Sequence, residues 1–174
     1  MKEKLRLYLE ENIKKDKPLF GSFKRGKVNY DSFYESELLE EVPKERACAA
    51  ISIDNYINDN KDENKFQKLL FNHIDRRNLK DSDVYNKVNI DRRLFSKIRS
   101  DSNYHPSKET VILLAISLEL SEDELEDLLV SASYSLPKNN YFDLIIRFCF
   151  KEKIYDLFTI NEYLNDYNCK VLAI

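Results

Sequence analysis

The side chains best suited to chemistry in this sequence are cationic and hydroxyl groups within one short stretch, residues 91–100. If this stretch is a helix, its spacing places Phe95 and Ile98 on the buried face. The groups left facing outward are Arg92, Arg93, Ser96 and Lys97. An arginine can present two donors to O6 and N7 of guanine, and a lysine can neutralise a phosphate. The stretch therefore predicts contacts with double-stranded DNA.

The charge distribution favours the same chemistry. Residues 76–108 contain nine basic and four acidic residues, a local balance of +5, whereas the whole chain carries −3. The remainder therefore carries −8, because −3 minus +5 is −8, and such asymmetry is typical of one basic face on an acidic body. The alternative is a solvated charged helix without a nucleic-acid partner. We add Lys80, Ser82 and Arg99 to the predicted contact set. Within that set, Lys80 and Lys97 are expected to lie on phosphates.

Several kinds of enzyme are disfavoured by what the sequence lacks. Two glycines, Gly21 and Gly26, cannot build a dinucleotide-binding fingerprint or a phosphate-cradling loop, and G-x-S-x-G is absent. No carboxylate pair or nucleophile with a base stands at a spacing that catalysis requires. The cysteines are odd in number, widely spaced and distant in sequence from both histidines, so neither a disulfide framework nor a metal site is expected. We predict no enzyme activity, no metal and no cofactor.

Composition indicates a helical protein. The chain has 174 residues, 43% of them apolar, enough for one compact domain with an appendage or for two small domains. Few glycines and prolines, with abundant Leu, Lys, Glu, Asp and Asn, predict an all-α fold. No run approaches the roughly 18 apolar residues that span a bilayer, and the charged start MKEKLRLYLEENIKKDK does not resemble a signal peptide. A cytoplasmic protein without a membrane partner is expected.

The first third of the chain is expected to differ from the rest. Apolar residues at a spacing of four predict an amphipathic helix over residues 1–16, ending before Pro18. Residues 19–60 lose this periodicity and contain both glycines and long charged runs, which suits a linker or a partly ordered arm, with a short hairpin around FGSFKRGKVNY as a further hypothesis. We therefore divide the chain into residues 1–60 and a helical domain, residues 61–174.

Five helices are expected between residues 66 and 131. The first carries His73, interpreted as a hydrogen-bonded boundary residue, and ends at Asn78. Two short helices, residues 81–88 and 91–100, follow with only a turn between them, which is the spacing of a helix-turn-helix. The expected caps are Asn89 in the left-handed conformation, Asp91 opening the helix after it, Ser107 opening a fourth helix and a capping box at Ser121–Glu124 before a fifth. The predicted core is Leu69, Leu70, Ile74, Val84, Val88, Phe95, Ile98, Val111, Leu114, Ala115, Leu118, Leu125 and Leu128.

These segments resemble a known family. LKDSDVYNKVNIDRRLFSKIRSD followed by HPSKETVILLAISLELSEDELEDLL is similar to the five-helix DNA-binding domain of lambda-repressor-like, or XRE-type, regulators. The cap at Asp91, the apolar pair Phe95 and Ile98, and the segment 106–115 carry the resemblance. It implies a lambda-repressor-like bundle that binds DNA. The sequence also resembles a helical tail module of bacterial multidomain proteins, which implies that the fold need not serve transcription.

The sequence departs from the family pattern at three positions. Tyr85 stands where the family usually has a small residue between the two motif helices, so its ring is expected either to splay the helices or to turn outward. Asn89 and Glu119 stand where the family usually has glycine.

The C-terminal part is expected to extend the bundle. Phe142, Ile145, Ile146 and Cys149 indicate a buried helix face. A second capping box, Thr159–Glu162, predicts a helix that ends near Asn168. The many aromatic residues of this region suit core packing or a self-association surface, and the sequence leaves both open.

Two classes of function are therefore expected. The first is a DNA-binding transcriptional regulator of bacterial or phage origin, acting as a homodimer because one recognition helix reads few base pairs. The second is a protein-interaction adaptor or inhibitor, for example in phage defence or counter-defence, with residues 1–60 docking a protein partner.

Overall fold

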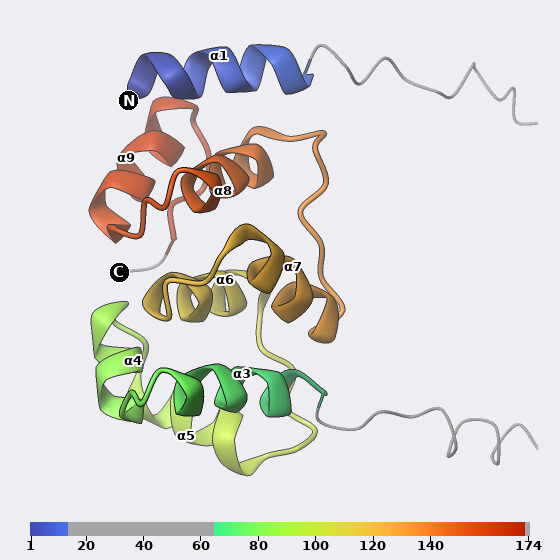
Figure 1. Ribbon diagram of the computed structural model, residues 1–174, viewed down its shortest axis with the longest axis vertical. Helices are drawn as coiled ribbons and strands as arrows, with labels where there is room; N and C mark the ends of the chain where they lie inside the picture. The colour runs from blue at the N-terminus through green and yellow to red at the C-terminus, as the bar shows by residue number, and fades with distance from the viewer. Residues whose placement is uncertain (14–64, 173–174) are drawn as a thin grey trace, which may run out of the picture. The chain divides into compact units, whose positions relative to one another are not determined.

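The regular elements are helices throughout the part of the chain that the computed structural model describes, residues 1–13 and 65–172 (Figure 1). They are α1 (Lys2–Ile13), α3 (Lys65–Arg76), α4 (Asp81–Lys87), α5 (Arg92–Ser100), α6 (Lys108–Ser117), α7 (Glu122–Ser131), α8 (Tyr141–Lys151) and α9 (Leu157–Asp166). The prediction of an all-α fold is confirmed for these residues. The predicted arm, the hairpin hypothesis and the boundary near residue 60 fall outside them.

From α3 to α9 the helices lead from one end of the described unit to the other, and α1 lies at the end formed by α8 and α9 (Figure 1). At one end α3 packs against α7, α4 packs against α5, and α4 also contacts α6. The pair α6 and α7 occupies the middle. Beyond it α7 contacts α8, which packs against both α9 and α1. The helix predicted at the N-terminus is present as far as Ile13, and it belongs to the same compact unit as the helices that follow Lys65.

Polar caps and left-handed residues delimit the helices as the sequence indicates. Asp91 Oδ1 accepts a hydrogen bond from the Arg93 amide at 2.6 Å, and Ser107 caps α6 in the same way. The Ser121–Glu124 capping box is complete, with both reciprocal hydrogen bonds formed. Six non-glycine residues of the described ranges have φ between 50° and 60°, the region that stops a helix: Asn78, Asn89, Glu119, Ser133, Lys153 and Asn168.

One predicted cap is wrong. Thr159 does not open the last helix, because Asp156 caps it one turn earlier. Asp156 Oδ2 accepts hydrogen bonds from the Thr159 amide at 2.8 Å and from the Thr159 hydroxyl at 2.7 Å. An ionised carboxylate is a stronger acceptor than a hydroxyl, which explains why the helix starts at the aspartate.

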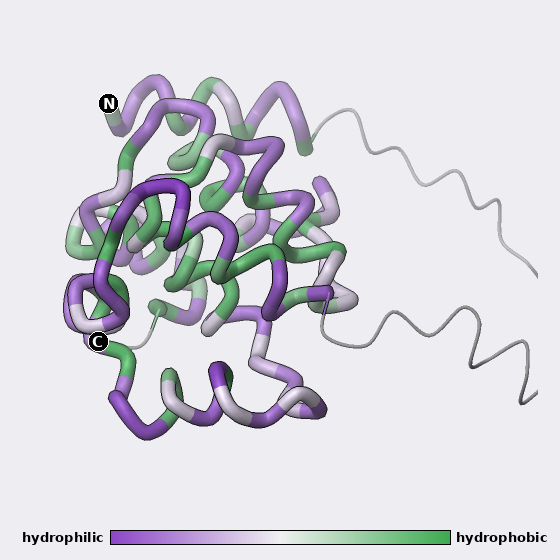
Figure 2. Tube along the Cα trace, turned by 60° about the horizontal axis from the view of Figure 1, so that its bottom comes forward, coloured by the Kyte–Doolittle hydropathy of each residue, from purple (hydrophilic) through white to green (hydrophobic). Residues whose placement is uncertain are grey.

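The core matches the predicted set closely. Twelve of the thirteen predicted core residues are buried, whereas Leu69 is only half-buried. The buried stripe of α3 runs through Phe66, Leu70 and Ile74, and this places Leu69 at the stripe's edge. Figure 2 shows hydrophobic segments inside the unit and hydrophilic residues along its outer turns.

Helix α6 lies at the centre of this core. Every residue from Val111 to Ser117 is buried, and the Ser117 hydroxyl donates to the Val84 carbonyl of α4 at 2.6 Å. At its start, Lys108 Nζ lies 2.6 Å from Oδ1 of Asp143, a carboxylate that is almost fully buried at the beginning of α8. A charged contact thus joins the middle of the unit to its C-terminal helices.

The aromatic residues of the C-terminal helices are mainly core. Phe148, Phe150 and Tyr163 are buried, and the Tyr8 ring of α1 lies 5.4 Å from that of Phe148. Phe158 and Tyr141 are exceptions, with 74% and 46% of their surfaces exposed. On the predicted buried face of α8, Ile145, Ile146 and Cys149 are buried and Phe142 is half-buried.

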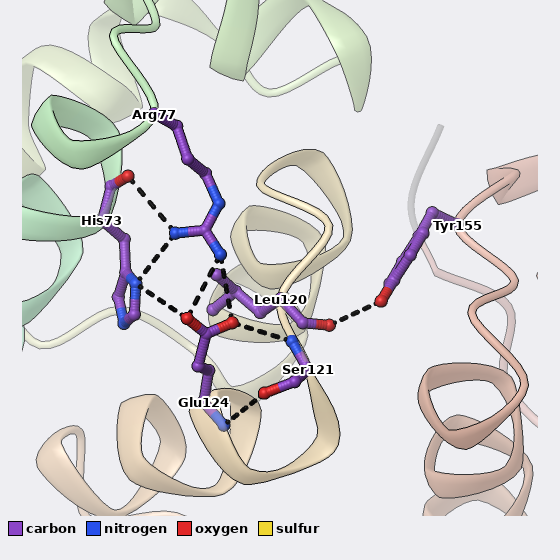
Figure 3. A network of polar contacts seen from close by, with 6 residues as sticks. All are labelled: His73, Arg77, Leu120, Ser121, Glu124 and Tyr155. Carbon is purple, nitrogen blue, oxygen red and sulfur yellow. Dashed lines mark hydrogen bonds and ion pairs between the residues drawn. The ribbon is translucent and has the colours of Figure 1, made fainter.

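A polar network joins α3 to α7 (Figure 3). Arg77 donates to His73 Nδ1 at 3.1 Å and to both carboxylate oxygens of Glu124 at 3.2 and 3.0 Å. Burial lowers the pKa of His73 below its ordinary value. Burial acts to raise the pKa of Glu124, but hydrogen bonds from the Ser121 amide and from Arg77 outweigh it, so that pKa is lowered. His73 is therefore a hydrogen-bonded residue, as predicted, although it is more deeply buried than a boundary position implies.

Candidate nucleic-acid interface

The predicted contact residues lie on two short helices whose opposite faces are anchored in the core. Four residues, Val88–Asp91, connect α4 to α5. On α5 the buried residues are Phe95 and Ile98, and on α4 the buried residue is Val84. With these positions fixed inside, the start of α5 presents its remaining side chains to solvent.

Tyr85 is accommodated between the helices at the rim of their contact. Its half-buried ring lies 5.5 Å from that of Phe95, and the Phe71 ring of α3 meets Phe95 edge-on at 6.3 Å. The ring therefore does not turn fully outward and remains packed against the core. One aromatic contact series joins α3, α4 and α5.

A groove of about 640 Å³ runs beside this aromatic series. It contains five of the seven predicted contact residues, namely Lys80, Ser82, Arg92, Ser96 and Arg99. Asp75 and Asp81 also line it. The structure thus brings most of the predicted set to one surface, while Arg93 and Lys97 lie outside the groove on the same exposed helix.

The predicted cationic side chains differ in the contacts that they form with the rest of the protein. The side chains of Lys80, Arg92 and Arg93 are exposed, and none forms an ion pair or hydrogen bond with another residue of the described ranges. Lys97 Nζ lies over the Tyr104 ring, 4.7 Å from its centre. Arg99 is more tightly held, because its Nη2 donates to Asp81 Oδ1 at 2.6 Å.

Sequence reasoning missed two features of this surface. Arg76, exposed at the end of α3, lies outside the predicted contact set, although its side chain also forms no ion pair or hydrogen bond in the described part of the chain. The pairing of Arg99 with Asp81 was missed as well, since the two residues are 18 positions apart on different helices. No local pattern in the sequence indicates such a contact.

Other sites are not apparent where the structure is described. Among residues 1–13 and 65–172, no group of three His, Cys, Asp or Glu side chains is placed to hold a metal ion. Burial raises the pKa of the Cys149 thiol to about 12, so that this cysteine is a poor nucleophile. No helix in the same ranges is long and apolar enough to cross a membrane.

Comparison with known proteins adds no further assignment. No protein-family model, curated protein or solved structure matches the chain.

Proposed function

We propose that this protein is a DNA-binding regulator in which α4 and α5 act as a helix-turn-helix and α3–α7 form a lambda-repressor-like bundle. Three observations support the proposal: five helices at the expected places, a turn of four residues between α4 and α5, and a recognition helix anchored by Phe95 and Ile98. The proposal depends most on one observation, the exposed and unpartnered arginine pair at the start of α5.

The position of that pair is unfavourable for the isolated fold. Arg92 and Arg93 occupy the first turn of α5, where the N-cap Asp91 supplies one carboxylate and the turn itself contains no acidic residue, and cations are disfavoured at the positive end of a helix dipole. By contrast, the first turn of α7 carries three acidic residues. An anionic partner at the start of α5 would offset this penalty, and DNA is such a partner.

Each predicted residue has a distinct part in this function. Arg92 and Arg93 contact base edges or the adjacent phosphates, with each bidentate contact to guanine contributing about 1 to 3 kcal/mol of discrimination. Lys80 and Lys97 contact phosphates, and Ser82 and Ser96 line the groove together with Lys80. A homodimer extends the short site that one recognition helix reads.

The first test is the salt dependence of binding. Fluorescence anisotropy with a duplex of mixed sequence is expected to show affinity that falls steeply with salt, by about 0.9 in log slope for each phosphate neutralised. Lys80→Ala should flatten that slope by about one unit for all sequences. The matched control is Lys138→Ala, an exposed lysine on the connection between α7 and α8, which should leave the slope unchanged. Absence of binding at low salt contradicts the proposal.

A protein-interaction adaptor is the second candidate, and the character of the groove favours it. Leu79 and Tyr85 contribute apolar surface to the groove, and Asp75 and Asp81 bring negative charge to it. A mixed surface of this kind also suits a protein partner. If the parent protein binds no duplex at low salt, the same surface becomes the first place to seek a protein partner by substitution.

A further inference from the structure

We propose that Arg99 is a positioning residue, which neutralises Asp81 and ties the start of α4 to the end of α5 so that the groove beside Arg92 accepts a phosphate. This inference rests on the proposed function. It also changes the expected role of Arg99, which the sequence places among the residues that touch DNA.

The geometry around Arg99 is that of a support between three helices. Its Nη2 donates to Asp81 Oδ1 at 2.6 Å, which joins the last turn of α5 to the first residue of α4. Its guanidinium carbon lies 4.1 Å from the centre of the Phe71 ring of α3. Since Phe71 also meets Phe95 edge-on, Arg99 is stacked on the aromatic series that holds α5 in place.

The groove's charge balance depends on this arginine. Its ionisable lining consists of two carboxylates, Asp75 and Asp81, and three cations, Lys80, Arg92 and Arg99. The groove therefore carries one net positive charge with Arg99 and none without it. Because Asp81 is already paired, the unpartnered cations Lys80 and Arg92 remain available to a phosphate.

A direct contact and a positioning role predict different results when Asp81 is neutralised. If Arg99 supports the groove, Arg99→Gln weakens DNA binding mainly because it leaves the negative charge of Asp81 unpaired. Adding Asp81→Asn should then restore the affinity for DNA. If Arg99 binds phosphate itself, neutralising Asp81 cannot replace the lost contact. Asp83 provides the matched control, since it is an exposed carboxylate two residues away whose only side-chain contact within the described ranges is a hydrogen bond from Ser82.

The experiment compares the full chain with four variants, Arg99→Gln, Arg99→Gln/Asp81→Asn, Arg99→Gln/Asp83→Asn and Arg99→Lys, on one mixed-sequence duplex at two salt concentrations. Arg99→Gln is expected to weaken binding about tenfold without changing the salt slope, as the exposed charge acts over a few Å in a partly solvated groove. Adding Asp81→Asn should restore affinity to within about twofold of the parent, whereas adding Asp83→Asn should not. Arg99→Lys, which keeps a cation beside Asp81, should stay within about threefold of the parent.

Two results overturn the inference. In the first, Arg99→Gln flattens the salt slope by about one unit and adding Asp81→Asn does not restore it. That result identifies Arg99 as a phosphate contact. The other is an absence of coupling between residues 81 and 99 in a double-mutant cycle on unfolding midpoints without DNA. If the cycle shows coupling but the parent binds no duplex, the proposed DNA function fails together with the phosphate role of the groove, while the support between the helices stands.

Discussion

The start of α5 and the C-terminal helices use charged side chains in opposite ways. At the C-terminal end, Lys2 of α1 pairs with Glu162 and Asp166 of α9, and Arg147 of α8 pairs with Glu122 and Glu126 of α7. These contacts join helices to one another. At the start of α5, Arg92 and Arg93 have no partner in the described part of the chain. Charge that joins helices has a structural role, whereas charge left open on a rigid helix is available to another molecule.

The largest expected effect tests whether each of the two regions is anchored by a buried ring. Phe95→Ala in α5 and Phe148→Ala in α8 should each lower the free energy of unfolding by about 3 to 5 kcal/mol, because each buried ring leaves lost transfer energy and a cavity. Urea unfolding of both variants measures the effect. Phe158→Ala, at an exposed position, should change stability by less than about 0.5 kcal/mol. An unchanged unfolding midpoint for Phe95→Ala is incompatible with the assigned core.

A smaller effect is expected from the charge pair that joins α6 to α8. Lys108→Met leaves the buried carboxylate of Asp143 without its cation, which should cost about 3 kcal/mol. The control is Lys170→Met, which removes an exposed pairing with Glu109 and should cost less than about 1 kcal/mol. Chemical denaturation at pH 7 compares the two. Equal stabilities of the two variants would mean that the Lys108–Asp143 pair does not hold α6 to α8.

Acid should loosen the contact between α3 and α7 through His73. Because burial lowers the His73 pKa, the unfolded chain binds its proton more readily than the folded chain does. Stability should therefore fall as the pH falls from 7 through the ordinary value of 6.5, by up to about 1.4 kcal/mol for each unit of pKa lowering.

His73→Gln separates this effect from that of the neighbouring carboxylate. The variant should lose the pH dependence between about pH 7 and 5. It should keep the loss below about pH 4.5, since the lowered pKa of Glu124 stabilises the fold only while that group is ionised. Urea midpoints measured across this range provide the comparison, and an unchanged slope between pH 7 and 5 in His73→Gln argues against a titrating His73.

Sequence predicted the local features of both regions better than the contacts between them. Caps at Asp91, Ser107 and Ser121 are determined by neighbouring residues, so their residue types and spacing suffice. The Thr159 cap was wrong because Asp156 accepts from both the amide and the hydroxyl of Thr159, so the helix begins one turn before Thr159. The Arg99–Asp81 pair was invisible because it depends on how α4 crosses α5, which no local pattern encodes.

The smallest expected effect of a substitution is an increase in stability, whereas the substitutions above lower it. Arg92→Gln/Arg93→Gln removes two cations from the positive end of the α5 dipole and should raise stability by about 0.3 to 1 kcal/mol. Lys97→Gln, in the last turn of the same helix, removes a cation from the favourable end and should lower stability slightly. Thermal unfolding at low ionic strength measures both. Destabilisation by the double arginine variant would show that the pair supports the fold rather than a partner.

The most direct measurement is duplex binding by Arg92→Ala/Arg93→Ala against a matched control, Lys65→Ala/Lys138→Ala. Both variants lose two exposed positive charges, but only the first loses them from the start of α5. The arginine variant is expected to bind at least about tenfold more weakly than the parent and to discriminate less among duplex sequences. The control should remain within about threefold. If the arginine variant binds DNA as tightly as the parent, α5 is not the recognition helix and the proposed function is contradicted.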